Sequence, residues 1–202
     1  MRRYFIKVWY FCDPLYYSFT RLKYIGKHNK NPGNIFRVRL TRYKGREVTL
    51  KDGTTIRKND LLLKIHLHNV RILHDIQHIK DDVKKGFMIY QIVKESMPGL
   101  ATYVQSHKRY DEIKGVIGIT MLSKGSRRLG FEKVTIKNLI YKWMKVCTFL
   151  PICFLSLTRP SIGKIRKLPE PVYLFMSKAD LVNRYSDLKR QSTYIKKADN
   201  SL

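Results

Sequence analysis

Residues 34 to 43, with the sequence NIFRVRLTRY, alternate between apolar and polar side chains. Because successive side chains of a strand point to opposite faces, this period of two predicts a strand with one basic face. Short strand-like runs follow, separated by Asp52-Gly53 and Asn59-Asp60, and Asp-Gly between two such runs is a strong hairpin signal. Residues 34 to 68 are therefore predicted to form an antiparallel meander, with LLLKIHLH as its third strand.

Helices are predicted on both sides of this meander. Residues 3 to 25 combine aromatic and basic side chains around a break at Asp13-Pro14, which predicts an amphipathic N-terminal helix. The chain after the meander is helical in character, and Pro98-Gly99 divides it. The helices expected there are residues 70–79, 80–96 and 98–107.

The C-terminal half adds further strands and helices. Its apolar, β-branched runs predict strands at residues 113–122, 131–136 and 171–176. Residues 138–150 are helical in character, and Ser177 and Asp180 have the spacing of a capping box, which predicts a helix after the last strand. The expected fold class is α+β, a single domain with a mostly antiparallel sheet or small barrel, packed by helices, with the amphipathic helix at its N-terminus.

Charge is the most unusual property of the composition. Lys and Arg number 41 against 15 Asp and Glu, a net charge of +26 that is spread along the chain. Such a surface attracts polyanions, meaning nucleic acid, anionic lipid headgroups or acidic wall polymer, or is simply a solvated basic face. No Walker A, dinucleotide, zinc-ribbon or RNA-reading motif is present, so no cofactor is expected and nucleic-acid binding would be non-specific.

The cysteines and the apolar segments bear on the cellular compartment. Cys12, Cys147 and Cys153 each lie in an apolar run without a CxxC partner, which predicts reduced core thiols and a reducing compartment. The apolar segment from residue 146 to residue 157 contains Pro151 and is shorter than the ~20 residues that a membrane span needs. It is expected to be buried or interfacial. We therefore expect a cytoplasmic protein that can lie peripheral to the membrane.

Four of the chain's six histidines lie in KIHLHNVRILHDIQH. His66 and His68 share one face of a strand, and His74 and His78 share one face of the following helix. Two such imidazole pairs could bind zinc, but nothing in the spacing makes them converge, and no metal site is expected.

The end of the strand is the better candidate for chemistry. His66, His68 and Asn69 are expected at a rim of the sheet, either in a polar network or in a pocket, and are the candidate catalytic residues. Arg71, which follows them closely, is a candidate anion-binding residue. The glycine turn SKGSRR, with Arg127 and Arg128, could bind an anionic group through backbone N–H donors and two guanidinium groups, or could be a hairpin turn with solvated arginines.

Four segments, taken in order, resemble the YkoP-like family: NIFRVRLTRYKG, LKDGTTIRKNDLLLKIHLHNVRIL, GVIGITMLSKGSRRLGFE and VYLFMSKADLVNRY. The resemblance covers nearly the whole chain, and DG…ND…HLHN is its most specific part. The chain departs from the family at Asn59-Asp60, where Gly-Asp is common, and this affects only the turn. The matching positions that we would mutate first are Asp52, Asp60, His66, His68, Asn69, Arg71, Arg127, Ser177 and Tyr185.

The resemblance implies a context rather than an activity. Members of the family are small proteins of Bacillus and its relatives, and the domain also occurs attached to polysaccharide deacetylases. This chain lacks a deacetylase's metal-binding motif, so it is not itself a deacetylase of that type. The resemblance divides the chain into an N-terminal helical segment and loop (residues 1–30), a YkoP-like α+β domain (31–189) and a polar tail (190–202).

Three functional hypotheses remain. The first is a basic accessory protein of envelope polysaccharide or glycolipid metabolism that binds an anionic polymer or a membrane surface. The second is an enzyme for a phosphorylated or glycosyl substrate, in which His66, His68 and Asn69 meet Arg71 or Arg127 in one cleft. The third is a non-specific nucleic-acid binder.

Overall fold

A computed structural model describes residues 22–25, 34–121, 123–156, 163 and 169–186 of the chain. The strands are β1 (Lys23–Tyr24), β2 (Phe36–Arg42), β3 (Val48–Thr49), β4 (Thr55–Ile56), β5 (Leu61–Leu67), β6 (Ile113–Thr120), β7 (Glu132–Thr135) and β8 (Val172–Ser177). The helices are α2 (Asn69–Ile76), α3 (Asp82–Gln105), the short 3₁₀ helix η1 (Ser126–Leu129), α4 (Leu139–Ser156) and residues 178–186. The predicted α+β class is confirmed.

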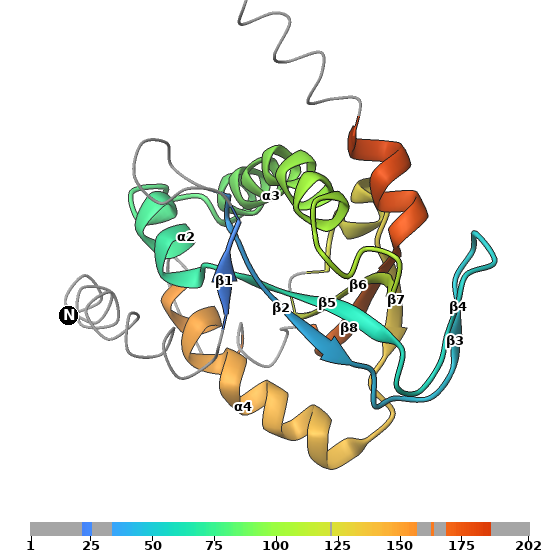
Figure 1. Cartoon of the computed structure of the whole chain (residues 1–202). Helices are drawn as coiled ribbons and strands as arrows, with labels where there is room; N and C mark the ends of the chain where they lie inside the picture. Colours follow the sequence, from blue (N-terminus) through green and yellow to red (C-terminus); the bar gives the residue numbers. More distant parts are fainter. Residues whose placement is uncertain (1–21, 26–33, 122, 157–162, 164–168, 187–202) are drawn as a thin grey trace, which may run out of the picture.

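The main sheet has six strands in the order β1-β2-β5-β6-β8-β7 (Figure 1). Only β5 and β6 pair in parallel, and the other neighbours are antiparallel. The mostly antiparallel sheet is therefore confirmed. The alternative of a small barrel is wrong, because β1 and β7 form the two edges and do not pair with each other.

The predicted meander is only partly correct. β2 pairs directly with β5 along its whole length, and β3 and β4 form a separate two-stranded arm between them. The ladder of β2 and β5 continues beyond the strands, since the N–H of Tyr43 donates to the carbonyl of Asp60 and the N–H of Asn59 donates to the carbonyl of Tyr43. Asn59 has a φ of 72°, which asparagine tolerates better than most residues and which lets the chain re-enter β5.

The predicted break at Pro98-Gly99 is wrong, because α3 continues through both residues. Asp81 caps the helix by accepting hydrogen bonds from the N–H groups of Val83 and Lys84, at 2.7 and 2.9 Å. Beyond Pro98 the helix buries Leu100, Ala101 and Val104 in the core. This burial outweighs the backbone hydrogen bond that proline cannot make.

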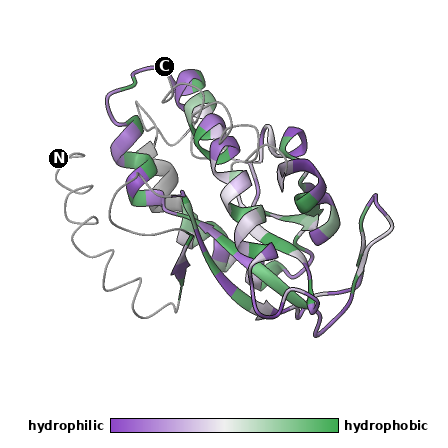
Figure 2. Cartoon of the chain, turned by 45° about the horizontal axis from the view of Figure 1, so that its top comes forward, coloured by the Kyte–Doolittle hydropathy of each residue, from purple (hydrophilic) through white to green (hydrophobic). Residues whose placement is uncertain are grey.

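Helices cover both faces of the sheet. Figure 1 shows α2, α3 and residues 178–186 on one side and α4 on the other. The main core, which includes Val38, Leu63 and Met176, lies on the α3 side, and a smaller core around Leu62 and Phe175 lies on the other. Much of the sheet is hydrophobic in Figure 2, as expected of central strands that have a core on each face.

Three further expectations are corrected or lie outside the described residues. Lys23–Tyr24 is a strand and not the end of a helix, and the rest of the predicted N-terminal helix falls outside the described residues. The helix expected at 138–150 extends to Ser156, because the apolar run continues. Cys147 is an exposed free thiol rather than a core residue, because it lies on the outer face of α4.

Among the helices that the structure describes, none could cross a bilayer.

Candidate anion-binding site

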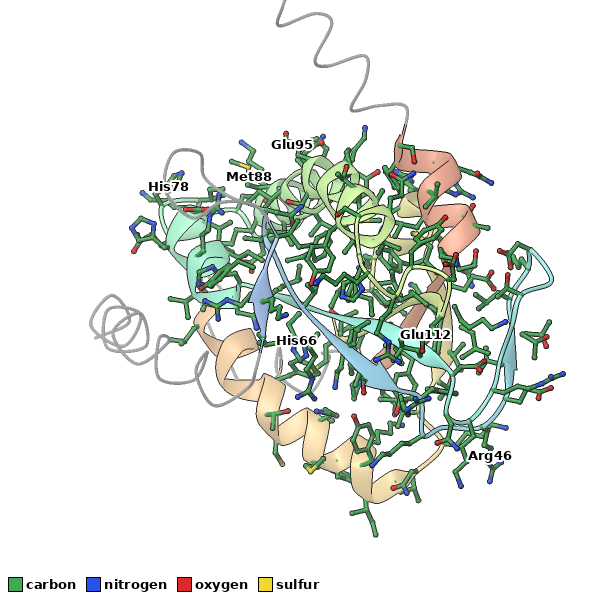
Figure 3. All side chains as sticks on the ribbon, in the orientation of Figure 1. Arg46, His66, His78, Met88, Glu95 and Glu112 are labelled. Atoms are coloured by element: carbon green, nitrogen blue, oxygen red, sulfur yellow. The ribbon has the colours of Figure 1, made fainter. Side chains whose placement is uncertain are left out.

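Basic side chains gather on the face of the sheet that α4 covers. In the register of β2 and β5, Arg37 lies opposite His66 and Arg39 lies opposite Lys64. These side chains point away from the main core because their neighbours in each strand, such as Val38 and Leu63, point into it. Figure 3 shows His66 between the strands and α4. α4 adds one lysine, and we call the five residues the basic cluster: Arg37, Arg39, Lys64, His66 and Lys145.

Aromatic rings border the basic cluster at both ends. Arg37 is only 3% exposed, donates a hydrogen bond from Nη2 to the hydroxyl of Tyr24 at 2.5 Å, and places its Cζ 4.8 Å from the centre of that ring. At the other end, Tyr141 of α4 stacks on Tyr173 of β8 with their centroids 6.4 Å apart. The Nζ atom of Lys145 lies 5.2 Å from the centre of the Tyr141 ring. The Tyr24 hydroxyl thus lies beside Arg37, and Tyr141 is close enough to Arg39 for the guanidinium charge to act on its pKa.

Burial and neighbouring cations lower two pKa values in the cluster. Burial, followed by the charges of Lys145 and Arg39, lowers the pKa of Lys64 from 10.5 to about 8. Burial, followed by four cationic side chains of which Lys64 is the strongest, lowers the pKa of His66 from 6.5 to about 4. Every charged group behind these two shifts is positive. An anion bound here would reverse the repulsion and raise both pKa values.

His66 gives a direct test of this environment. Its Nε2 atom is buried and has no hydrogen-bond partner within the part of the chain that the structure describes. The fold keeps the imidazole neutral down to a pKa of about 4, whereas the unfolded chain protonates it near 6.5. The unfolded state therefore binds more protons as the pH falls through this range, and we expect the free energy of unfolding to drop by about 2 kcal/mol between about pH 7.5 and pH 5.

Urea unfolding at the two pH values measures this loss. Glutamine does not titrate, so between the two pH values the free energy of unfolding of His66→Gln should fall by about 2 kcal/mol less than that of the native protein. His78→Gln replaces an exposed histidine, and its free energy of unfolding should fall as much as that of the native protein. An identical pH dependence for His66→Gln and the native protein would contradict the proposed environment of His66.

His68 and His74 lie outside the basic cluster. The ring of His68 packs edge-on against Tyr24 with the centroids 5.8 Å apart, and Asn69 begins α2. Within α2, Asp75 lies 3.7 Å from the Nε of Arg71 and 3.4 Å from Nδ1 of His74. In the part of the chain that the structure describes, no three His, Cys, Asp or Glu side chains are grouped so as to hold a metal ion.

Arg127 lies at a different place, in a cavity of about 350 Å³. Asp52 and Ser177 also line this cavity, so the fold brings together three of the positions chosen from the family resemblance. The lining does not include His66, His68, Asn69, Arg71 or Arg128. The enzyme hypothesis requires Arg127 in one cleft with His66, His68 and Asn69, and this cavity does not bring them together.

The polar groups of the cavity mostly bind one another. The backbone N–H of Lys51 donates to Glu132 at 2.7 Å, and Ser177 Oγ accepts from the N–H of Asp180 at 2.9 Å, as a helix cap does. Burial raises the pKa of Asp52, but hydrogen bonds from Ser177 and Thr54 outweigh it and lower the pKa. The cavity residues thus hold the β3–β4 arm against the sheet.

Two more matching positions have structural contacts. The carboxylate of Asp60 accepts a hydrogen bond from the N–H of Arg57 at 2.7 Å within the turn before β5. The buried Tyr185 donates its hydroxyl to the carbonyl of Leu129 at 3.0 Å. The predicted site residues did not include Arg37, Arg39, Lys64 or Lys145, which form most of the basic cluster. The alternation of residues 34–43 did predict a basic face on this strand.

Fold and site together define a basic α+β protein with a cationic, aromatic-lined face beneath one helix. The model of the family described as the YkoP domain matches residues 2–185, and the chain belongs to that family. It is 46% identical over 185 residues to the "Uncharacterized protein YkoP" of Bacillus subtilis strain 168, covering 92% of this chain and 98% of that protein. No solved structure matches the chain.

Proposed function

We propose that this protein binds a phosphate-bearing anionic partner of the cell envelope through its basic cluster, as an accessory to envelope polysaccharide or glycolipid metabolism. The observation that supports this best is the register of β2 and β5, which places the arginines of β2 opposite Lys64 and His66 on the face that α4 covers. Burial, followed by the charges of Lys145 and Arg39, lowers the pKa of Lys64 to about 8. A fold that keeps like charges together at partly buried positions loses stability by doing so, and an anion relieves that loss.

The donors of the cluster suit a phosphate group. Arginine offers paired N–H donors that match phosphate oxygens, and lysine adds a point charge. Burial raises the pKa of both Tyr141 and Tyr173, and their side chains hydrogen-bond each other. One hydroxyl proton of the pair is left to donate to an anion. Lipid headgroups and wall polymers share this phosphate chemistry, and the family resemblance favours the envelope as its source.

Binding agrees better than catalysis with the state of His66. A general base works best with a pKa near the pH of the reaction. The pKa of His66 is about 4 in the free protein, so it accepts a proton poorly at neutral pH. The neutral ring can instead donate or accept a hydrogen bond at its buried Nε2, which has no partner among the described residues.

Calorimetric titration with long-chain polyphosphate tests the proposal, with random-sequence duplex DNA and neutral dextran as comparisons. We expect saturable binding of polyphosphate at ~0.15 M salt and none of dextran. Absence of polyphosphate binding even at low salt would overturn the proposal. Tighter binding of DNA than of polyphosphate at every salt concentration would also overturn it, in favour of a nucleic-acid binder.

A further inference from the structure

The outer face of α4 exposes large apolar side chains to solvent. The exposed fractions of these side chains are 68% for Leu139, 84% for Ile140, 67% for Trp143 and 50% for Met144. Cys147 continues the same face one turn further along. These positions recur at the spacing of a single helix face, and we call them the α4 apolar face.

The α4 apolar face carries no charge. Thr148, also exposed, donates its hydroxyl to the carbonyl of Lys145 at 2.9 Å, so this side chain needs no water. Lys145 lies on the sheet side of the helix with the basic cluster, and Lys142 pairs with Glu170 at 2.5 Å. In a surface helix of a globular protein the apolar side normally faces the core, so this arrangement requires an apolar partner.

We infer that α4 lies in the plane of an anionic membrane, with the α4 apolar face inserted among the lipids at the headgroup boundary. Aromatic and aliphatic side chains on one helix face, with lysines beside them, are the features of helices that bind membranes in this way. The helix is at the outside of the molecule, on the side of the sheet opposite α3, so a flat surface can reach it (Figure 1).

The net charge of the chain selects this occupant among the alternatives. A second copy would bring two chains of +26 together, and their repulsion opposes association through this face. Nucleic acid would satisfy the charge but has a polar backbone that leaves the aliphatic side chains without a partner. An anionic bilayer supplies both negative charge and an apolar layer.

This inference stands on different side chains from the proposed function, so the two can fail separately. The basic cluster is defined by partly buried cations of β2, β5 and α4, whereas the α4 apolar face is defined by exposed side chains. Loss of one should leave the other intact.

Vesicle binding by the full chain tests the inference. The probes are vesicles of phosphatidylcholine alone and vesicles of equal phosphatidylcholine and phosphatidylglycerol. Binding is measured by co-sedimentation and by the fluorescence of Trp143 in a Trp9→Phe background, since the chain has two tryptophans. We expect binding to the anionic vesicles only, with a blue shift of the Trp143 emission.

A pair of variants locates the surface. Ile140→Ser with Met144→Ser should weaken binding to anionic vesicles by about tenfold or more and leave the affinity for polyphosphate unchanged. The matched control, Val83→Ser with Phe87→Ser, removes two exposed apolar side chains of α3, at 81% and 63%, and should change vesicle binding by less than about threefold. Unchanged vesicle binding by the α4 variant, or an equal loss in the control, would overturn the inference.

Discussion

Replacing Arg39 and Lys64 together by glutamine should weaken the binding of polyphosphate by about 100-fold. Each substitution removes a charge-assisted hydrogen bond to phosphate, which contributes about 1.5 kcal/mol or more. Calorimetric titration of the double variant at ~0.15 M salt gives the result directly. Glutamine keeps much of the length of both side chains, so the packing beneath α4 should be retained.

The matched control keeps the same loss of net charge. Lys94→Gln with Lys108→Gln changes two exposed lysines away from the basic cluster. Lys94 lies in α3, on the other side of the sheet, and Lys108 lies just beyond the C-terminal end of α3. This double variant should weaken polyphosphate binding by less than about threefold. The Arg39/Lys64 variant should also unfold at the same temperature as the native protein or higher, because it removes repulsion. Equal losses of affinity in the two double variants would mean that polyphosphate responds to overall charge and not to the basic cluster.

Phe175→Ala should lower the free energy of unfolding by about 3 to 5 kcal/mol, as large-to-small changes of buried aromatic residues do. Phe175 is fully buried in the smaller core. Its ring is perpendicular to that of Tyr43, with the ring centroids 5.6 Å apart, and its centroid lies 5.8 Å from that of Tyr173. The substitution therefore leaves a cavity beneath the tyrosine pair that borders the basic cluster.

Urea unfolding measures this effect, and Phe87→Ala is its control. Phe87 is 63% exposed, so its removal should cost less than about 1 kcal/mol. If Phe175→Ala were no more destabilising than Phe87→Ala, Phe175 would not pack in the smaller core.

Local signals in the sequence were sufficient for much of the fold. The alternation around Arg37 and Arg39 predicted β2, and Ser177 with Asp180 predicted the helix that follows β8, where the cap hydrogen bond is observed. Local rules failed at Pro98 because the cost of proline in a helix is small beside the burial of the residues after it. They also could not show that β2 pairs with β5 across the arm, since that contact is long-range.

The candidate site was less predictable than the fold for the same reason. The basic face of the strand at Arg37 and Arg39 could be predicted from its alternation, but not that Lys64 would lie opposite it or that α4 would add Lys145. The histidines of KIHLHNVRILHDIQH separate, with His66 in the basic cluster and His68 beside Tyr24. Arg127 lines a cavity that lies elsewhere, and its role in anion binding stays a prediction.

The titration of Lys64 by carbon-detected NMR of the lysine Cε signals tests the role of the basic cluster most directly, with Lys64→Arg to assign the resonance. In the free protein the pKa should be about 8, below the ordinary value of 10.5. Saturating polyphosphate should raise it by at least about one unit, because the bound anion favours the charged amine. A pKa near 10.5 in the free protein, or a value near 8 that polyphosphate leaves unchanged while it binds, would contradict anion binding at this site.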